Sequence, residues 1–278
     1  MLKLNTLSGF GAGKGKLVNT TDFYEDLTTL SLTGDCEVCL DAGDSTSYPG
    51  SGTKWLDISG NGHDFFLGAA ASVDGDEPTF NGVSGGLSSS EYFTYDGSND
   101  MFQYDTTVPA FAQSWHKNNA DFTIIFWHYF DSANAGQIIC TFTGSGHTNT
   151  GMTIQAGGYQ SHQFVCANGT SSPPLNFIAD TPPLGGAYAG WRMTGLSLDE
   201  AAGAGGSFWV ENDQYHQYSA SDTFDGTYTA PDAGACDGEL MLGIPDSGRK
   251  TAGVMLFSSS LTKVEMDSIY NQTKTRFL

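Results

Sequence analysis

Basic residues are scarce in this sequence, and their scarcity excludes the commonest anionic partners. Only 11 lysines and arginines stand against 31 aspartates and glutamates in 278 residues, a formal net charge of −20 at pH 7. Such a balance repels phosphate backbones and anionic membrane surfaces. We therefore expect neither a nucleic-acid partner nor a membrane partner. The acidic residues are spread thinly, which is typical of a solvated surface.

Long hydrophobic runs are missing as well. No segment approaches the roughly 18 apolar residues of a membrane span. The N-terminal stretch MLKLNTLSGFGAGKGKL also lacks the apolar core of an export signal. We expect a soluble chain that carries no such signal.

The cysteines are too few and too widely spaced for a disulfide framework. They stand at Cys36, Cys39, Cys140, Cys166 and Cys236, an odd set that leaves at least one thiol free. Cys36 and Cys39 have C-x-x-C spacing, but they lie in a strand-like run, CEVCLD. Residues three apart on a regular strand face opposite sides. We therefore favour packing for this pair, with redox or zinc chemistry as the alternative.

Recognisable catalytic motifs are also lacking. The Gly82–Gly86 stretch matches G-x-S-x-G, but another strand-like run follows where a nucleophile elbow needs a helix. The Gly11–Lys16 stretch departs from a phosphate-binding loop at two positions. No pair of carboxylates has the spacing used by sandwich glucanases, and no histidines have zinc-hydrolase spacing. The sequence therefore predicts a protein that is not an enzyme.

Glycine and aromatic residues, in contrast, are abundant. There are 36 glycines, and aromatics make up 13% of the chain. Short alternating runs between clusters of Gly, Ser, Asp and Asn are typical of many short strands joined by tight turns, as in an antiparallel sandwich. The predicted strands are 36–40, 91–95, 101–105, 122–130, 137–143, 151–156, 163–167, 191–198, 207–212, 239–244 and 252–258.

One helix is predicted near the end of the chain, over about 263–274. Thr262 and Glu265 have the spacing of a capping box, in which each side chain accepts a hydrogen bond from the other residue's backbone N–H. Met266, Ile269 and Tyr270 then share one face. We expect this helix to lie on the sandwich.

Two turns are rich in acidic and amide side chains. WLDISGNGHD (55–64) includes Asp57 and Asn61, and YDGSND (95–100) includes Asp96 and Asp100. Carboxylate and amide oxygens are the ligands that Ca²⁺ prefers. The alternative is that these side chains bond their own turn backbone.

Four stretches in order resemble one family. They are LDAGDSTSYPGSGTKWLDISGNG (40–62), YDGSND (95–100), DFTIIFW (121–127) and the segment 253–262. They look like motifs of the concanavalin A-like, laminin-G-like (LamG-type) domains of bacteriophage structural proteins and bacterial surface proteins. The resemblance implies an all-β, two-sheet antiparallel jelly-roll sandwich with a short C-terminal helix over 35–278. It also implies a Ca²⁺ site, for which Asp57, Asn61, Asp96 and Asp100 are the candidate ligands.

Aromatic residues suggest where a glycan would bind. The strand at 122–130 carries large side chains on both faces, so we expect it to be covered on both sides and Trp127 to be a core residue. Better candidates for stacking on a sugar are rings that stand among Gly, Gln, Asn and Asp. These are Tyr159, Trp209, Tyr215 and Tyr218.

The N-terminal segment differs in composition from the rest. Residues 1–34 begin with a Gly-rich stretch that carries Lys3, Lys14 and Lys16 on an otherwise acidic chain. We expect an extended arm that docks on a larger surface through these lysines. A frayed terminus is the alternative.

Together these observations favour a non-enzymatic virion protein of a tailed phage, either a capsid decoration protein or a head or tail fibre, assembled in the host cytoplasm. The expected partners are the major capsid protein or a fibre component, host surface glycans and further copies of the chain. The alternative is a glycan-binding module of a bacterial surface or secreted protein. A glycoside hydrolase of the same fold lacks its carboxylates.

Overall fold

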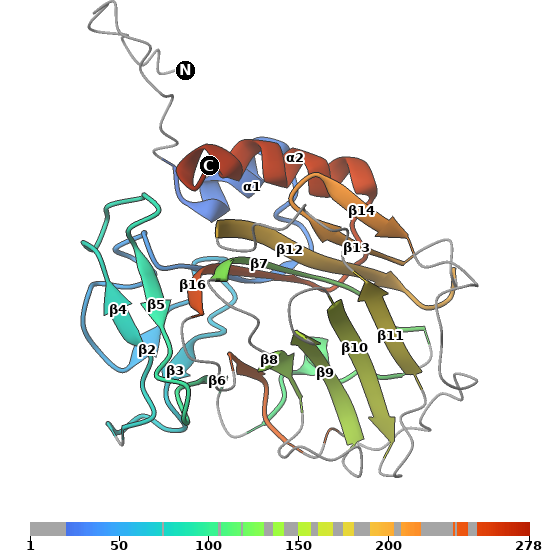
Figure 1. The fold of residues 1–278 in the computed structure, drawn as a ribbon, viewed down its shortest axis with the longest axis horizontal. Coiled ribbons are helices and arrows are strands. Elements are labelled where there is room, and N and C mark those ends of the chain that lie inside the picture. Colours follow the sequence, from blue (N-terminus) through green and yellow to red (C-terminus); the bar gives the residue numbers. More distant parts are fainter. Residues whose placement is uncertain are drawn as a thin grey trace, which may run out of the picture.

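Two antiparallel sheets lie face to face, and helices cover the outer face of one of them (Figure 1). This computed structural model describes residues 21–73, 75–104, 107–117, 119–130, 136–141, 150–156, 161–168, 175–180, 190–202, 207–217, 236, 238–243 and 249–278. The predicted jelly-roll sandwich with a short C-terminal helix is confirmed. Within the described residues, no helix combines the length and the hydropathy needed to cross a bilayer.

Sheet A carries the long strands. Its order is β14-β13-β12-β7-β16-β5-β4, and β1 also pairs with β16. Neighbours that are distant in sequence, such as β7 and β16, show that the chain crosses repeatedly between the two layers. The bounds are β1 (Cys36–Asp41), β4 (Thr79–Asn81), β5 (Tyr92–Thr94), β7 (Asp121–Phe130), β12 (Gly190–Asp199), β13 (Phe208–Glu211), β14 (Gln214–Gln217) and β16 (Lys250–Phe257).

Sheet B lies opposite, with the order β11-β10-β9-β8-β15-β6-β3-β2. Its strands are shorter at the β2 end, where tight turns follow one another closely. The bounds are β2 (Lys54–Trp55), β3 (Phe65–Leu67), β6 (Phe102–Tyr104), β8 (Gly136–Cys140), β9 (Thr150–Ala156), β10 (Ser161–Asn168), β11 (Leu175–Asp180) and β15 (Met241–Leu242). A 3-10 turn, η1 (Ala110–Ala112), precedes β7.

The core between the sheets is built on aromatic rings. Trp55, Phe93 and Phe102 are fully buried. The Trp55 ring centroid lies 4.8 Å from that of Phe93 and 4.9 Å from that of Phe102. Their tilted and edge-on contacts add to the free energy gained by burying the rings themselves.

A second core lies between sheet A and the helices. Here β7 presents Ile125 and Trp127 outward, while Ile124 and Phe126 face sheet B. Trp127 is fully buried, and its Nε1 donates to Thr273 Oγ1 at 2.9 Å. The predictions that this strand is covered on both faces and that Trp127 is a core residue are confirmed.

The C-terminal helix α2 (Lys263–Thr273) begins where the sequence predicts and is followed by a 3-10 turn, η3 (Lys274–Arg276). The capping box is present: Thr262 N donates to Glu265 Oε2 at 2.7 Å, and Glu265 N donates to Thr262 Oγ1 at 3.3 Å. Met266, Ile269 and Tyr270 are buried against sheet A, as predicted.

An N-terminal helix, α1 (Phe23–Leu30), corrects part of the predicted arm. Residues 1–34 are expected to be extended, yet this helix packs on the outer core. Phe23 and Leu27 stand four residues apart on one face, and each is 1% exposed. Asp22 caps the helix by accepting a hydrogen bond from Glu25 N at 2.8 Å. Residues 1–20, with Lys3, Lys14 and Lys16, lie outside the described residues, so their docking role stays a prediction.

Candidate functional site

The turn that follows β2 is fastened to β1 by the side chain of Asp57. Its Oδ1 accepts hydrogen bonds from Cys39 N and Ser59 N, each at 2.9 Å. Its Oδ2 accepts from Ser59 Oγ at 2.7 Å and from His63 N at 3.1 Å. Asn61 Nδ2 donates to the carbonyl of Cys36 at 2.9 Å. These contacts hold the DISGNG turn against the neighbouring strand.

The second acidic turn is organised in the same way. Asp96 Oδ1 accepts from Ser98 N, and Asp100 Oδ2 accepts from Asp96 N, each at 2.7 Å. Burial is the largest cause that raises the pKa of Asp100.

The four predicted calcium ligands thus serve their own turns and the strand beside them. In the part of the chain that the structure describes, no group of three or more His, Cys, Asp or Glu side chains is arranged to hold a metal ion. A cation at Asp57 would have to displace hydrogen bonds that both carboxylate oxygens already make. Calcium binding stays a prediction.

Trp209 is a core residue, which corrects its assignment as a sugar platform. Its side chain is 2% exposed and points between the sheets, because Trp209 pairs with Leu196 on the inward-facing side of β13. A sugar arriving from solvent does not reach a ring in this position. Tyr215 lies in β14, but its side chain is outside the described residues, as are Tyr159 and Tyr218 altogether.

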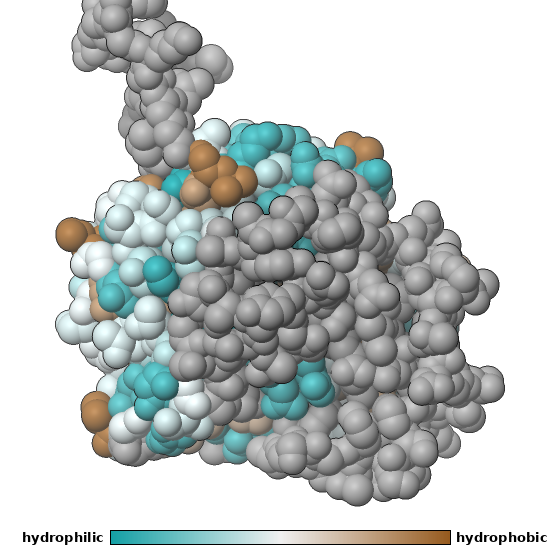
Figure 2. Space-filling model, in the orientation of Figure 1, coloured by the Kyte–Doolittle hydropathy of each residue, from teal (hydrophilic) through white to brown (hydrophobic). Residues whose placement is uncertain are grey.

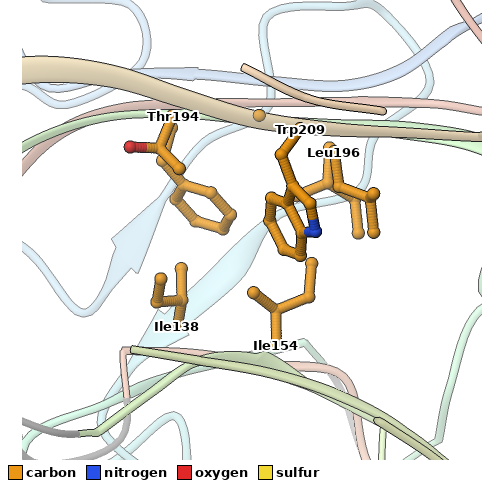
Figure 3. A pocket seen from close by; sticks show the side chains of 8 residues that line it. Ile138, Ile154, Thr194, Leu196 and Trp209 are labelled. Atoms are coloured by element: carbon orange, nitrogen blue, oxygen red, sulfur yellow. The ribbon is translucent and has the colours of Figure 1, made fainter. Parts of the chain in front are cut away.

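The space beside Trp209 is too small for a ligand. Figure 3 shows Trp209, Leu196 and Thr194 facing Ile138 and Ile154 across the gap between the sheets. The void that they enclose, about 10 Å³, holds roughly one water molecule. Its lining is apolar, so it is a packing defect of the core.

A row of polar side chains crosses the inner face of sheet A next to this void. Tyr95 Oη donates to Thr251 Oγ1 at 3.1 Å, and burial raises the pKa of Tyr95 to about 12. His128 Nε2 lies 2.7 Å from Thr194 Oγ1.

At the far side of this row, Arg192 and Glu211 form a buried ion pair. Burial raises the pKa of Glu211, although the guanidinium of Arg192 opposes this shift. A glycosidase needs a second carboxylate opposite the first. Glu211 is instead engaged with a permanent cation, so the row serves structure.

The two thiols of the C-x-x-C stretch lie on the same face, contrary to the expectation for a regular strand. The pairing of β1 with β16 shifts register between Cys36 and Val38, so Glu37 is an extra residue. The bulge brings Cys36 and Cys39 into the same core under the helices. Both thiols are free and buried. Burial, followed by the hydrogen bond to Cys36, raises the pKa of Cys39 well above its ordinary value.

Sequence reasoning missed a set of aromatic side chains on the outer face of sheet A. The set consists of three aromatic residues and one lysine, namely Tyr92 from β5, Tyr129 from β7, Trp191 from β12 and Lys250 from β16. All four are half-buried. We call them the aromatic row. Lys250 Nζ lies 4.8 Å from the ring centroid of Tyr92 and 4.4 Å from that of Tyr129. Strand register brings these residues together, because Tyr129 pairs with both Trp191 and Lys250.

Neither a family model nor a curated protein matches the chain. Solved structures do match. The botulinum neurotoxin serotype D binding domain has a TM-score of 0.56 and 13% identity over 87% of this chain and 52% of that one. A structure of botulinum neurotoxin type C, whose cell entry depends on interaction with two ganglioside molecules, has a TM-score of 0.57 and 10% identity over 88% and 53%.

The binding domain of botulinum neurotoxin DC in complex with SialylT is similar as well, with a TM-score of 0.57 and 11% identity over 87% of this chain and 52% of that one. The chain thus spans about half the length of these binding domains. At such low identity the likeness establishes the fold alone. It confirms a β-sandwich that other proteins use in binding domains.

Proposed function

We propose that the protein is a non-enzymatic carbohydrate-binding module carried on the virion of a tailed bacteriophage, as a capsid decoration protein or a head or tail fibre. The observation that carries the binding role is the fold. It is shared over 87% of the chain with the binding domain of botulinum neurotoxin DC in complex with SialylT. Because fold alone does not determine function, the proposal needs a direct test.

Buried carboxylates support the non-enzymatic part of the proposal. Asp41 is held by Arg276, and Glu211 by Arg192. Glu91 accepts hydrogen bonds from Ser88 N at 2.7 Å and from Val83 N at 3.3 Å. Each of these groups has a structural task, whereas glycoside hydrolysis needs a pair of carboxylates free to act on one bond.

The virion part rests on the four stretches that resemble laminin-G-like domains of phage structural proteins. The cysteines agree with it, since all five thiols are free, including Cys36 and Cys39 on one buried face. Free thiols are typical of proteins assembled in a reducing cytoplasm. The proposed partners are the major capsid protein or a fibre component, host surface glycans and further copies of the chain.

The surface fits a soluble component of an assembly. On the face seen in Figure 2, the described surface is mostly hydrophilic or neutral, and hydrophobic side chains appear in isolated groups. Among the described residues, the large exposed hydrophobic ones are Val73, Val83, Val264 and Leu278, which are scattered along the sequence. Single exposed hydrophobics are normal for soluble proteins.

A glycan array probed with the purified chain tests the binding role. We expect retention on a subset of glycans, and no release of reducing sugar from those glycans on prolonged incubation. Absence of binding at every glycan and density would overturn the carbohydrate role. Hydrolysis that disappears on substitution of one carboxylate would overturn the non-enzymatic role.

Electron microscopy and mass spectrometry of native phage particles test the location. We expect the chain in the purified virion as density on the capsid or tail. The competing role, a glycan-binding module of a bacterial surface or secreted protein, is favoured by the neurotoxin binding domains that share the fold. Detection on the bacterial surface, and not in particles, would support that role instead.

A further inference from the structure

We propose that the aromatic row, made of Tyr92, Tyr129, Trp191 and Lys250, is the sugar-binding subsite of this sandwich, and that its ligand is an uncharged pyranose at the end of a glycan. This assignment rests on the proposed carbohydrate-binding function and adds the site and the ligand class to it. It also replaces Trp209, whose ring lies in the core.

Exposure distinguishes Trp191 from the other tryptophans. Of the five tryptophans, Trp55 and Trp127 are 0% exposed, Trp115 is 1% and Trp209 is 2%. Trp191 is half-buried and therefore keeps part of its ring at the surface. A sugar that stacks on indole thus has one tryptophan to use.

The row is arranged around a single ammonium group. Lys250 Nζ lies over the faces of both Tyr92 and Tyr129. Trp191 meets both tyrosines edge to face, with centroid distances of 5.8 Å to Tyr92 and 5.7 Å to Tyr129. Three rings and one cation therefore occupy one continuous patch of the sheet.

The polar groups of this patch have the chemistry to bond a sugar. Among the described residues, no hydrogen bond or ion pair is made by Tyr92 Oη, Tyr129 Oη, Trp191 Nε1 or Lys250 Nζ. These groups include an indole donor, two hydroxyls that donate and accept, and an ammonium with three donors. Sugar hydroxyls need such partners, while the C–H face of a pyranose needs the apolar rings.

The platform is rigid before any ligand arrives. Trp191 and Lys250 pair with Tyr129 from opposite sides in the hydrogen-bonded sheet, and β5 joins β16 at Lys250. Behind Trp191, the ring of Phe277 lies at 4.9 Å. Phe277 in turn stacks on the buried Trp127 at 4.4 Å. Side chains fixed in this way lose little conformational entropy on binding.

Charge selects the ligand class. The chain carries a net charge of −20. It therefore repels an acidic polysaccharide at separations within the Debye length, where salt screens charge only partly. The one ammonium of the aromatic row does not offset that field. It does supply hydrogen-bond donors to the hydroxyls of a neutral sugar.

Binding of neutral glycans by Lys250→Met and Tyr92→Ala tests the assignment. We expect each variant to bind about tenfold or more weakly than wild type, because each removes a central contact. Lys54→Met is the matched control, since Lys54 Nζ lies 4.9 Å from the Phe66 ring on sheet B. It should bind as wild type does, and melting temperatures should show that all three variants fold.

The outcomes separate this assignment from the function on which it rests. Wild-type protein that binds a neutral glycan, with Lys250→Met and Tyr92→Ala binding within about twofold of it, would overturn the site and leave the function standing. A preference for acidic glycans that weakens with salt would overturn the ligand class. Absence of glycan binding by the wild type would overturn the function and this assignment with it.

Quenching of tryptophan fluorescence by acrylamide, an uncharged quencher that the acidic surface does not repel, gives an independent measurement. Because the other four tryptophans are buried, the quenchable emission should come from Trp191 and should disappear in Trp191→Phe. A neutral glycan bound at the aromatic row should protect this emission in the wild type. Quenching that is unchanged at saturating glycan would overturn the assignment.

Discussion

Arg276 and Asp41 form a bidentate ion pair in which both side chains are fully buried. Arg276 Nη1 and Nη2 each lie 2.7 Å from one oxygen of the Asp41 carboxylate. Asp41 also accepts from Phe23 N at 3.1 Å, and the guanidinium carbon lies 4.8 Å from the Phe23 ring centroid. One ion pair therefore joins the C-terminal segment, the end of β1 and the start of α1.

Removing one partner of this pair should strongly destabilise the protein. Arg276→Met leaves the Asp41 carboxylate buried without its cation, which costs about 3–5 kcal/mol in comparable pairs. Urea unfolding of wild type and variant measures the difference. Lys274→Met, which removes a half-exposed charge two residues away, should cost far less. A loss below about 1 kcal/mol for Arg276→Met would show that water reaches Asp41.

The capping box at the start of α2 should contribute measurably to stability. Thr262→Ala removes the acceptor for Glu265 N and should lower the free energy of unfolding by about 0.5–2 kcal/mol. Ser268→Ala is a control within the same helix, because its hydroxyl donates to the carbonyl of Val264 and takes no part in the capping box. Equal effects of the two substitutions in thermal unfolding would contradict a specific role for the cap.

Local sequence signals predict much of the fold. Alternating runs identify strands such as β7 and β16, and the spacing of Thr262 and Glu265 places the start of α2 correctly. These features depend on residues within a few positions of one another. Short strands such as β2 and β4 were missed, because two or three residues give no periodicity. Helix α1 was missed because its buried face has two apolar residues, Phe23 and Leu27, beside a buried aspartate, Asp26.

The candidate site depends on long-range register, which a single sequence does not reveal. Trp191 and Lys250 flank Tyr129 only because β12 and β16 pair with β7 from opposite sides. Trp209 was placed at the surface because Gly, Asn and Asp residues stand within a few positions of it, although its face of β13 points into the core. Cys36 and Cys39 face the same side of β1 because of a bulge in the pairing of β1 with β16.

The stability of the protein should depend on pH through Asp22. Burial is the largest cause that raises the pKa of this carboxyl from 3.8 to about 6, and Asp44 beside it adds to the shift. The native state therefore binds more protons than the unfolded state between these values. It follows that the free energy of unfolding falls as pH rises through this window.

Asp22→Asn tests this dependence, because asparagine keeps an oxygen for the cap of α1. We expect the variant to unfold at a higher urea concentration than wild type at pH 7 and to lose that advantage near pH 4. Asp267→Asn serves as a charge-matched control and should retain the wild-type pH profile. A profile that is unchanged in Asp22→Asn would assign the dependence to other groups.

Thiol reagents should distinguish the cysteines by burial. Burial raises the pKa of Cys39 and of Cys166 well above the ordinary value. Only the thiolate attacks such reagents. Cys236 is half-buried, with its Sγ 3.6 Å from His116 Nδ1. We expect one thiol to react quickly in the native protein and Cys236→Ser to abolish that phase. A fast phase that persists in this variant would mean that a core thiol opens to solvent.

Two truncations should separate the N-terminal arm from the folded domain. Deleting residues 1–34 removes Phe23 and Leu27, whose burial contributes about 1.5–3 kcal/mol each, together with the Phe23 contacts to Asp41 and Arg276. This variant should melt far below wild type. Deleting residues 1–20 keeps α1 and its cap at Asp22, so its melting temperature should match that of wild type.

The shorter deletion is therefore the one that tests docking. It removes Lys3, Lys14 and Lys16 while leaving the sandwich and both helices intact, so a loss of binding to phage particles that lack the protein can be assigned to the arm. We expect that loss, and we expect glycan binding to be unchanged, because no residue of the aromatic row lies within residues 1–20. If the truncated protein binds particles as well as the full chain does, the lysines have no docking role and the contact surface lies on the sandwich itself. If it melts early, residues 1–20 pack on the domain, and they stabilise the fold instead of reaching a partner.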